Sequence, residues 1–157
     1  MEKIEKYTLL YEQIKALIEG ETDVVAVMAN VVAVIHETMG FWWTGFYCVK
    51  SKAGGEGTEL ALGPFQGPVA CMHIAFGRGV CGTSWARRET VVVPDVEQFP
   101  GHIACSSLSR SEIVVPVFSK AHEVVAVLDI DSKDLATFDN IDRQYLEAVC
   151  SLITPFF

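Results

Sequence analysis

The chain has 157 residues, of which half are hydrophobic and a fifth are charged, so it is long enough for one domain with a sizeable core and too apolar to be disordered. Its formal net charge of -8 repels phosphate backbones and anionic lipids, which disfavours nucleic acid and membranes as partners. The first twenty residues lack the apolar centre of a signal peptide and no apolar run could span a bilayer, so we expect a cytoplasmic protein with a single domain over residues 1–157.

Two helices are predicted at the start of the chain. The first is indicated by apolar residues that recur at helical spacing and by Gly20, which follows them: Tyr7, Leu10, Ile14, Leu17 and Ile18. Residues 22–39 are rich in Val and Ala, with apolar residues on nearly all sides. This composition favours a buried helix that ends at Gly40.

From residue 42 the pattern changes to strands. Six segments are β-prone: WWTGFYCVK, ELALGPF, PVACMHIAF, TVVVPDV, EIVVPVFS and EVVAVLDIDS. A short helix is predicted in GVCGTSWARR, a long polar loop in EQFPGHIACSSLSRS, and a closing helix from Asp139. Because the links between successive strands resemble hairpins, we expect the α+β class, with a mainly antiparallel sheet and helices packed on one face.

The chain has five cysteines, an odd number that does not suggest a permanent disulfide framework in a reducing compartment. Cys48 is predicted to share a buried strand face with Trp42 and Phe46, and Cys150 to pack in the closing helix. In PVACMHIAF, alternation directs Cys71 and His73 away from a core face that contains Ala70, Met72, Ile74 and Phe76. Cys71 is then either a small packing residue or a thiol outside the core.

Two further cysteines have positions that favour reactivity. Cys81 is placed in the first turn of the short helix, where unpaired N–H groups lower the pKa of a thiol; the alternative is a packing role between Val80 and Gly82. Cys105 is placed in the polar loop, where a thiol is accessible; the alternative is an inert surface thiol.

Carboxylates and aromatic residues form the other candidate groups. In LDIDS, Asp129 and Asp131 share one strand face, and a hairpin would bring Glu112 close to them. Three converging carboxylates suit a cationic ligand or an acid with a raised pKa, whereas a solvated strand end is the alternative. Trp43 and Tyr47 flank Gly45 on one face and could form the wall of a small apolar pocket, or belong to the core.

Other chemistries have little support. Gly77-Arg78-Gly79 lacks the lysine and spacing of a phosphate loop, and the chain has no C-x-x-C. The pairs Cys71-x-His73 and His102-x-x-Cys105 match no standard zinc spacing, and neither histidine lies in a hydrolase motif. We therefore predict neither a metal nor a cofactor.

The stretches WTGFY, LGPFQG, VACMHIAFGRGVCGTSWA, VPDVEQFPGHIAC, SRSEIVVPV and VLDIDS resemble the free methionine-R-sulfoxide reductases, a family with the GAF fold. They extend from Trp43 to Ser132. The three cysteines of that family fall on Cys71, Cys81 and Cys105, in steps of ten and twenty-four residues. The resemblance implies a sheet of about six strands.

The resemblance also implies a function. Trp43 and Tyr47 would enclose the methyl and sulfoxide end of free methionine (R)-sulfoxide, while Glu112, Asp129 and Asp131 would hold its ammonium group and protonate its oxygen. A thiolate would attack the sulfoxide sulfur, leaving a sulfenic acid that becomes a disulfide and is reduced by thioredoxin.

The order in which the thiols act is a separate prediction. Cys105 is favoured as the nucleophile because it lies on a polar loop, seven residues before Glu112, from which it can reach both the carboxylates and solvent. Cys71 is favoured as the resolving thiol and Cys81 as an assistant. Cys81 as the attacking thiol is the alternative.

A different hypothesis is a GAF module that binds a small ligand without turnover. Such modules are usually fused to an output domain, for which this chain has no room. The sequence leaves the oligomeric state open, with a homodimer among the alternatives.

Overall fold

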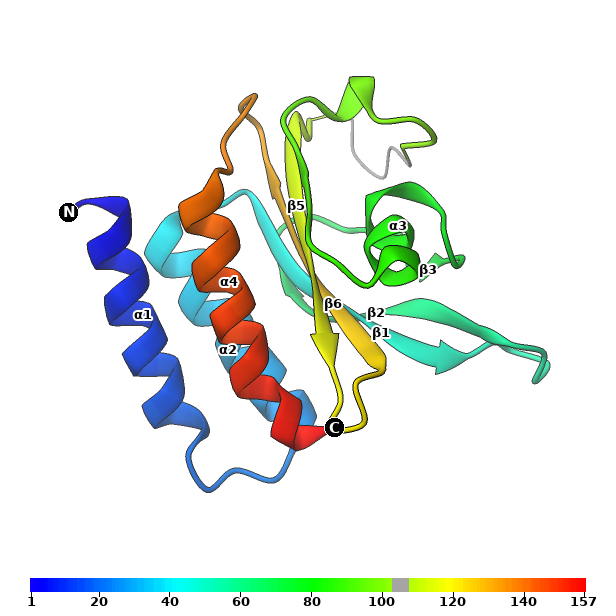
Figure 1. Cartoon of the computed structure of the whole chain (residues 1–157), viewed down its shortest axis with the longest axis horizontal. Coiled ribbons are helices and arrows are strands. Elements are labelled where there is room, and N and C mark those ends of the chain that lie inside the picture. The colour runs from blue at the N-terminus through cyan, green and yellow to red at the C-terminus, as the bar shows by residue number, and fades with distance from the viewer. Residues whose placement is uncertain (103–107) are drawn as a thin grey trace.

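The computed structural model describes residues 1–102 and 108–157. In this part of the chain, six strands form one sheet in the order β3-β2-β1-β6-β5-β4, and every neighbouring pair is antiparallel. Helices α1 (Lys3–Ile18), α2 (Val24–Met39) and α4 (Asn140–Ile153) pack on one face of the sheet, while α3 (Gly79–Arg87) lies on the other (Figure 1). The predicted α+β class and antiparallel sheet are confirmed, whereas the prediction that the helices pack on one face is wrong for α3, whose buried residues Val80, Cys81 and Trp85 pack with Trp43 and Tyr47.

The strands overlap the predicted segments, although β3 is much shorter than its segment. Their bounds are β1 (Trp43–Ser51), β2 (Thr58–Gln66), β3 (His73–Ile74), β4 (Val91–Val93), β5 (Ser111–Phe118) and β6 (Val124–Ser132). Two short 3-10 helices, η1 (Val96–Gln98) and η2 (Thr154–Phe156), follow β4 and α4. No helix in the described ranges is long and apolar enough to cross a membrane.

Local capping explains where the predicted helices begin and end. Gly40 has a left-handed backbone with φ 72°, and its N–H donates to His36 O, which closes α2. Asp139 is the N-cap of α4, and its side chain accepts hydrogen bonds from the backbone N–H groups of Ile141 and Asp142. Both of these predicted boundaries are confirmed.

Alternation along β1 and β6 divides the apolar side chains between two cores. One core, between the sheet and helices α1, α2 and α4, contains Phe46, Leu128 and Ile130, together with the buried thiols of Cys48 and Cys150. The second core, on the opposite face, contains Trp43 and Tyr47. The face opposite the three long helices therefore carries the aromatic residues that sequence analysis selected.

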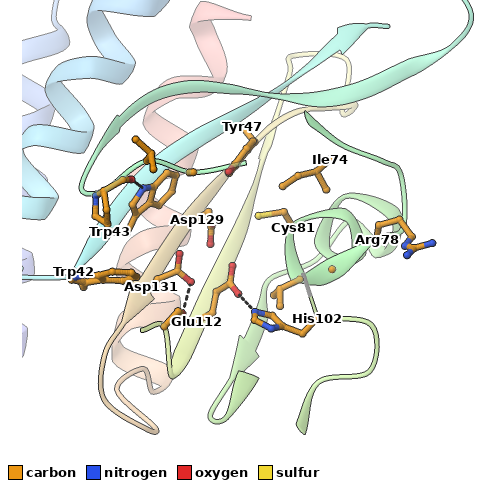
Figure 2. Close-up of a pocket in the computed structure, with 16 residues that line it drawn as sticks. Trp42, Trp43, Tyr47, Ile74, Arg78, Cys81, His102, Glu112, Asp129 and Asp131 are labelled. Carbon is orange, nitrogen blue, oxygen red and sulfur yellow. Dashed lines mark hydrogen bonds and ion pairs between the residues drawn. The ribbon is translucent and has the colours of Figure 1, made fainter. Parts of the chain in front are cut away.

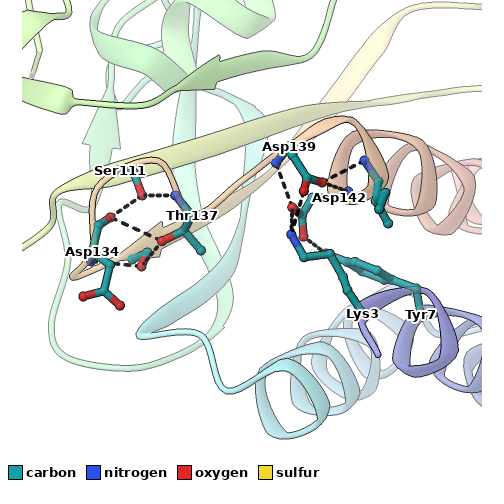
Figure 3. A network of polar contacts seen from close by, with 9 residues as sticks. Lys3, Tyr7, Ser111, Asp134, Thr137, Asp139 and Asp142 are labelled. Carbon is teal, nitrogen blue, oxygen red and sulfur yellow. Dashed lines mark hydrogen bonds and ion pairs between the residues drawn. The ribbon is translucent and has the colours of Figure 1, made fainter. Parts of the chain in front are cut away.

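A buried polar cluster fixes α1 against α4 (Figure 3). Tyr7 Oη donates to Asp142 Oδ1 at 2.6 Å, and Lys3 Nζ donates to Asp142 Oδ2 at 2.7 Å. Asp142 is 1% exposed, so these charge-assisted hydrogen bonds offset the cost of burying its carboxylate.

Two predictions about strand faces are wrong. Only His73 and Ile74 of the segment 68–76 form a strand, and of its predicted core face Ile74 is buried whereas Met72 is 68% and Phe76 60% exposed. The segment pairs with β2 at two positions only and then turns, because the N–H of Arg78 bonds back to Ala75 O. Trp42 precedes β1 and packs against the second core, away from Phe46 and Cys48.

Candidate active site

A pocket opens on the sheet face opposite the three long helices (Figure 2). The register of three strands assembles it, because Trp43 on β1 pairs with Asp131 on β6, which pairs with Glu112 on β5. The remaining described lining comes from strands β1, β3 and β6, from the first turn of α3 and from connecting segments: Trp42, Tyr47, Pro68, Val69, Ala70, Ile74, Arg78, Gly79, Val80, Cys81, His102, Ser109 and Asp129.

Three carboxyl groups converge in the pocket, as predicted. Glu112 and Asp129 are each 6% exposed, and Asp131 accepts a hydrogen bond from Ser109 Oγ at 3.1 Å. Asp129 Oδ1 is buried and has no hydrogen-bond partner among the described residues. His102 Nε2 lies 3.8 Å from Glu112 Oε1. An unpaired carboxyl oxygen facing a pocket indicates a place for a hydrogen-bond donor or a cation.

The strand that carries Glu112 is anchored next to the pocket. Ser111 Oγ donates to Asp134 O at 2.6 Å, and the N–H of Thr137 donates to Ser111 Oγ (Figure 3). These bonds tie the start of β5 to the segment after β6, which holds Glu112 in register with Asp131.

Burial and mutual repulsion determine the protonation of the three acids. Burial, and then the charges of Asp129 and Asp131, raise the pKa of Glu112 well above its usual range. Burial and the charge of Asp129 do the same to the pKa of Asp131. Burial also raises the pKa of Asp129, but hydrogen bonds with Glu112 and Cys81 act in the opposite direction. These causes favour the protonated form of Glu112 and Asp131, whereas the hydrogen bonds to Asp129 favour its carboxylate.

The aromatic wall faces these acids. Trp43 stacks on Tyr47 and Phe65, with ring centroids 6.0 and 5.3 Å apart, and its Nε1 donates to Pro68 O at 2.9 Å. Tyr47 Oη donates to Cys71 O at 2.8 Å, which links the wall directly to a cysteine of the predicted site. Alternation placed Trp43 and Tyr47 on one face, and the family resemblance implied that they form a wall.

The structure describes two of the three cysteines that match the family, Cys71 and Cys81. Cys81 is in the first turn of α3, 4% exposed and facing the acids (Figure 2). The predicted lowering of the pKa of its thiol is wrong, because burial and the charges of Asp129 and Glu112 raise that pKa well above its usual value. Cys71 is disulfide-bonded. Cys105 lies outside the described residues.

Side chains that could approach a cation are few in the described part of the pocket. One ligand atom each from Cys81, Glu112 and Asp129 lie within 4.8 Å of one another. The same group suits the ammonium of an organic ligand equally well. The alternative zinc histidines have other contacts, since His73 Nδ1 lies 3.0 Å from Glu59 and His102 lies against Glu112.

Sequence analysis did not select all of the lining. Ser109 was not considered, although it bonds Asp131. His102 was considered only as a base or a zinc ligand, and Trp42 only as a core residue. No local pattern indicates their roles, because strand pairings between distant segments bring them to the pocket.

Comparisons with known proteins agree with this geometry. The GAF domain family matches residues 21–156. The chain is 50% identical to "GAF domain-containing protein A" of Dictyostelium discoideum over 96% of this chain and 92% of that protein. It is 41% identical to the free methionine-R-sulfoxide reductase of Saccharomyces cerevisiae and 44% identical to that of Escherichia coli, covering 97% and 93% of this chain and 84% and 85% of theirs.

A solved structure is similar to this chain over nearly its whole length. The X-ray structure of the free methionine-R-sulfoxide reductase of Neisseria meningitidis, in complex with its substrate, superposes with a TM-score of 0.92 at 49% identity, covering 98% of this chain and 89% of that chain.

Proposed function

Because the chain belongs to the GAF-domain family of free methionine-R-sulfoxide reductases, we propose that it reduces free L-methionine (R)-S-oxide to L-methionine. The observation that carries the proposal is the pocket itself, in which an aromatic wall faces three carboxyl groups, two of them buried. A zwitterionic amino acid with a polar, weakly basic sulfoxide has the chemistry that such a pocket would bind.

Binding uses the charged and apolar sides of the pocket separately. Asp129, whose Oδ1 has no partner among the described residues, accepts the substrate ammonium. Trp43 and Tyr47 enclose the methyl group and the sulfoxide. Because a methionine inside a protein has no free ammonium, this arrangement favours the free amino acid.

The protonated acids then activate the sulfoxide. Burial and neighbouring charges raise the pKa values of Glu112 and Asp131, which favours the protonated form of both carboxyl groups. A proton donated to the sulfoxide oxygen makes the sulfur more electrophilic and allows the oxygen to leave as a hydroxyl group.

Thiol chemistry completes the reaction. The Cys105 thiolate attacks the sulfoxide sulfur and forms an S–S bond with it. The hydroxyl group then passes from the methionine sulfur to the cysteine sulfur as the S–O and S–S bonds break, so that methionine leaves and the cysteine becomes a sulfenic acid. The Cys71 thiol condenses with the sulfenic acid to form a disulfide and one water molecule. An external dithiol, for which we propose thioredoxin, then reduces the disulfide and becomes oxidised itself. The cycle needs no metal or organic cofactor, takes place in the cytoplasm and is compatible with a homodimer.

Cys81 has an assisting role in this scheme. Its thiol hydrogen-bonds to Asp129, and the surroundings that raise its pKa disfavour a thiolate. It therefore supports the charged acid and can relay the disulfide, whereas the accessible thiol attacks.

A direct assay tests the reaction. The purified protein is incubated with dithiothreitol and either epimer of free methionine sulfoxide, and methionine is measured. We expect turnover of the R epimer only, none of a peptide containing methionine sulfoxide, and at least a tenfold lower rate in Asp129→Asn. Turnover of the peptide at the rate of the free amino acid would refute the role of the ammonium site.

Trapping the sulfenic acid separates the thiols. Single Cys→Ser variants are treated with the R epimer and a dimedone-type reagent. We expect Cys71→Ser to accumulate one trapped sulfenic acid per chain and Cys105→Ser to form none. If Cys105→Ser still releases one methionine per chain, Cys81 is the attacking thiol.

A further inference from the structure

The segment 69–76 exposes apolar side chains around a cysteine. Val69 is 88%, Met72 68% and Phe76 60% exposed, and all three lie within five residues of Cys71. Exposed apolar side chains are common singly, but a group of them beside a functional sulfur is typical of a binding surface. We call these three residues the apolar collar.

The collar lies at an open edge of the sheet. Strand β3 is last in the strand order and pairs with β2 alone among the described strands. Its outer edge can therefore offer backbone N–H and C=O groups to an extended segment of another protein. The buried Ile74 anchors this edge to the second core, so the collar is held on a fixed element.

The charge of the surrounding chain is also unusual. None of the 20 acidic residues lies between Leu60 and Arg88, although the chain as a whole has a net charge of -8. Arg78 lies in this interval and directs its side chain away from the pocket acids (Figure 2). Glu59, which directly precedes this interval, is paired with His73, whose Nδ1 lies 3.0 Å from Glu59 Oε2. An acidic protein that the rest of the surface repels can approach here.

The disulfide of Cys71 lies beside the apolar collar and is the group that a docked reductant would reduce. Cys71 is only partly buried and it is disulfide-bonded. A disulfide is reduced when an incoming thiolate attacks one sulfur, which requires the partner to contact the residues beside it.

We propose that the apolar collar and the outer edge of β3 form the docking surface for an acidic dithiol protein of the thioredoxin type, which reduces the Cys71 disulfide. The inference rests on the proposed function, because it assumes that this disulfide forms in each catalytic cycle. The partner thiolate attacks the disulfide, forms a mixed disulfide and releases one cysteine of this chain as a thiolate. The second partner thiol then breaks the mixed disulfide, so that two electrons pass to this chain and the partner leaves as a disulfide.

The test compares a protein reductant with a small one. Met72→Glu places a charge in the collar, where it removes an apolar contact and repels an acidic partner. Leu9→Glu is the matched control, since Leu9 is 58% exposed on α1, across the sheet from the collar (Figure 1). Methionine production is measured with dithiothreitol and, separately, with thioredoxin kept reduced by its reductase and NADPH.

We expect Met72→Glu to raise the KM for thioredoxin about tenfold, as for a moderate interface contact, with unchanged turnover on dithiothreitol. Phe76→Glu should behave in the same way as Met72→Glu, whereas Met72→Leu and Leu9→Glu should behave like wild type. Because Phe76 also packs edge-on against Trp85, the melting temperature of its variant is measured as well. An unchanged KM for thioredoxin in both Glu variants, or an equal loss with dithiothreitol, overturns the proposal.

A second measurement keeps docking separate from catalysis. The protein is oxidised beforehand and its reduction by thioredoxin is followed through NADPH consumption, without methionine sulfoxide. Slower reduction in Met72→Glu supports the docking surface even if the sulfoxide is not the substrate. Equal rates in Met72→Glu and wild type refute it even if the sulfoxide is turned over.

Discussion

Replacing Gly45 with alanine tests how the aromatic wall is positioned. A Cβ atom at Gly45 would stand 2.5 Å from Phe65 Cβ and 2.5 Å from Trp43 Cη2, closer than any Cβ normally approaches. The backbone of Gly45 does not require glycine, since its φ is not positive. The effect is therefore overpacking, which costs about 1–3 kcal/mol and lowers the melting temperature by roughly 2–4 °C per kcal/mol in a chain of this size.

The kinetics of Gly45→Ala distinguish damage to the pocket from a general loss of stability. Because the Trp43 indole must move, we expect kcat/KM for free methionine (R)-sulfoxide to fall about 10- to 100-fold with dithiothreitol as reductant. Gly63→Ala is the control, since its Cβ would lie 3.1 Å from Phe46 O and 3.3 Å from Cys48 Sγ, away from Trp43. That variant should lose stability and keep its kinetics. Equal kcat/KM values in Gly45→Ala and Gly63→Ala would refute the reasoning.

Three further predictions follow from the polar contacts. Burial raises the pKa of Glu112, so the Glu112 carboxyl group contributes fully to stability below the pKa that it has in the unfolded chain, and this contribution is lost as the pH rises through the pKa that it has in the folded chain. Glu112→Gln should therefore melt about 2–4 °C above wild type at pH 7 and gain little at pH 4, while its turnover falls. Tyr47→Phe removes the hydrogen bond to Cys71 O and should slow disulfide formation, followed as loss of free thiols, about fivefold; a rate equal to wild type would exclude this role. Asp142→Asn weakens the contacts of Tyr7 and should lower the free energy of unfolding by about 2 kcal/mol in urea, with kcat/KM unchanged because the cluster lies on the helical face.

Alternation predicted the parts of the site that lie on long strands. Leu128 and Ile130 face the helical core while Asp129 and Asp131 face the pocket, because successive side chains of a strand point to opposite faces. The same rule placed Trp43 and Tyr47 together. It failed for Met72 and Phe76, since the short segment around them pairs at only two positions and is governed by its turn.

The electrostatics of the pocket could not be predicted locally. The position of Cys81 at a helix N-terminus favours a lowered thiol pKa, yet its pKa is raised. The helix contributes only partial charges, whereas burial of the thiol and the charge of Asp129, which comes from a strand far along the chain, disfavour the thiolate. A long-range contact therefore reverses a correct local argument.

The division of each strand between two faces also explains how the fold tolerates three acids in one pocket. On β6, Leu128 and Ile130 are fully buried against the helices on one face, while Asp129 and Asp131 lie on the other, where Asp129 Oδ1 is buried without a hydrogen-bond partner among the described residues. The apolar face stabilises the strand regardless of what occupies the pocket. The acids can therefore keep raised pKa values and an unpaired oxygen, which a ligand can use. A slip of one residue in the pairing of β6 would exchange the two faces and place both acids among the helices, so the same register that forms the core also forms the pocket.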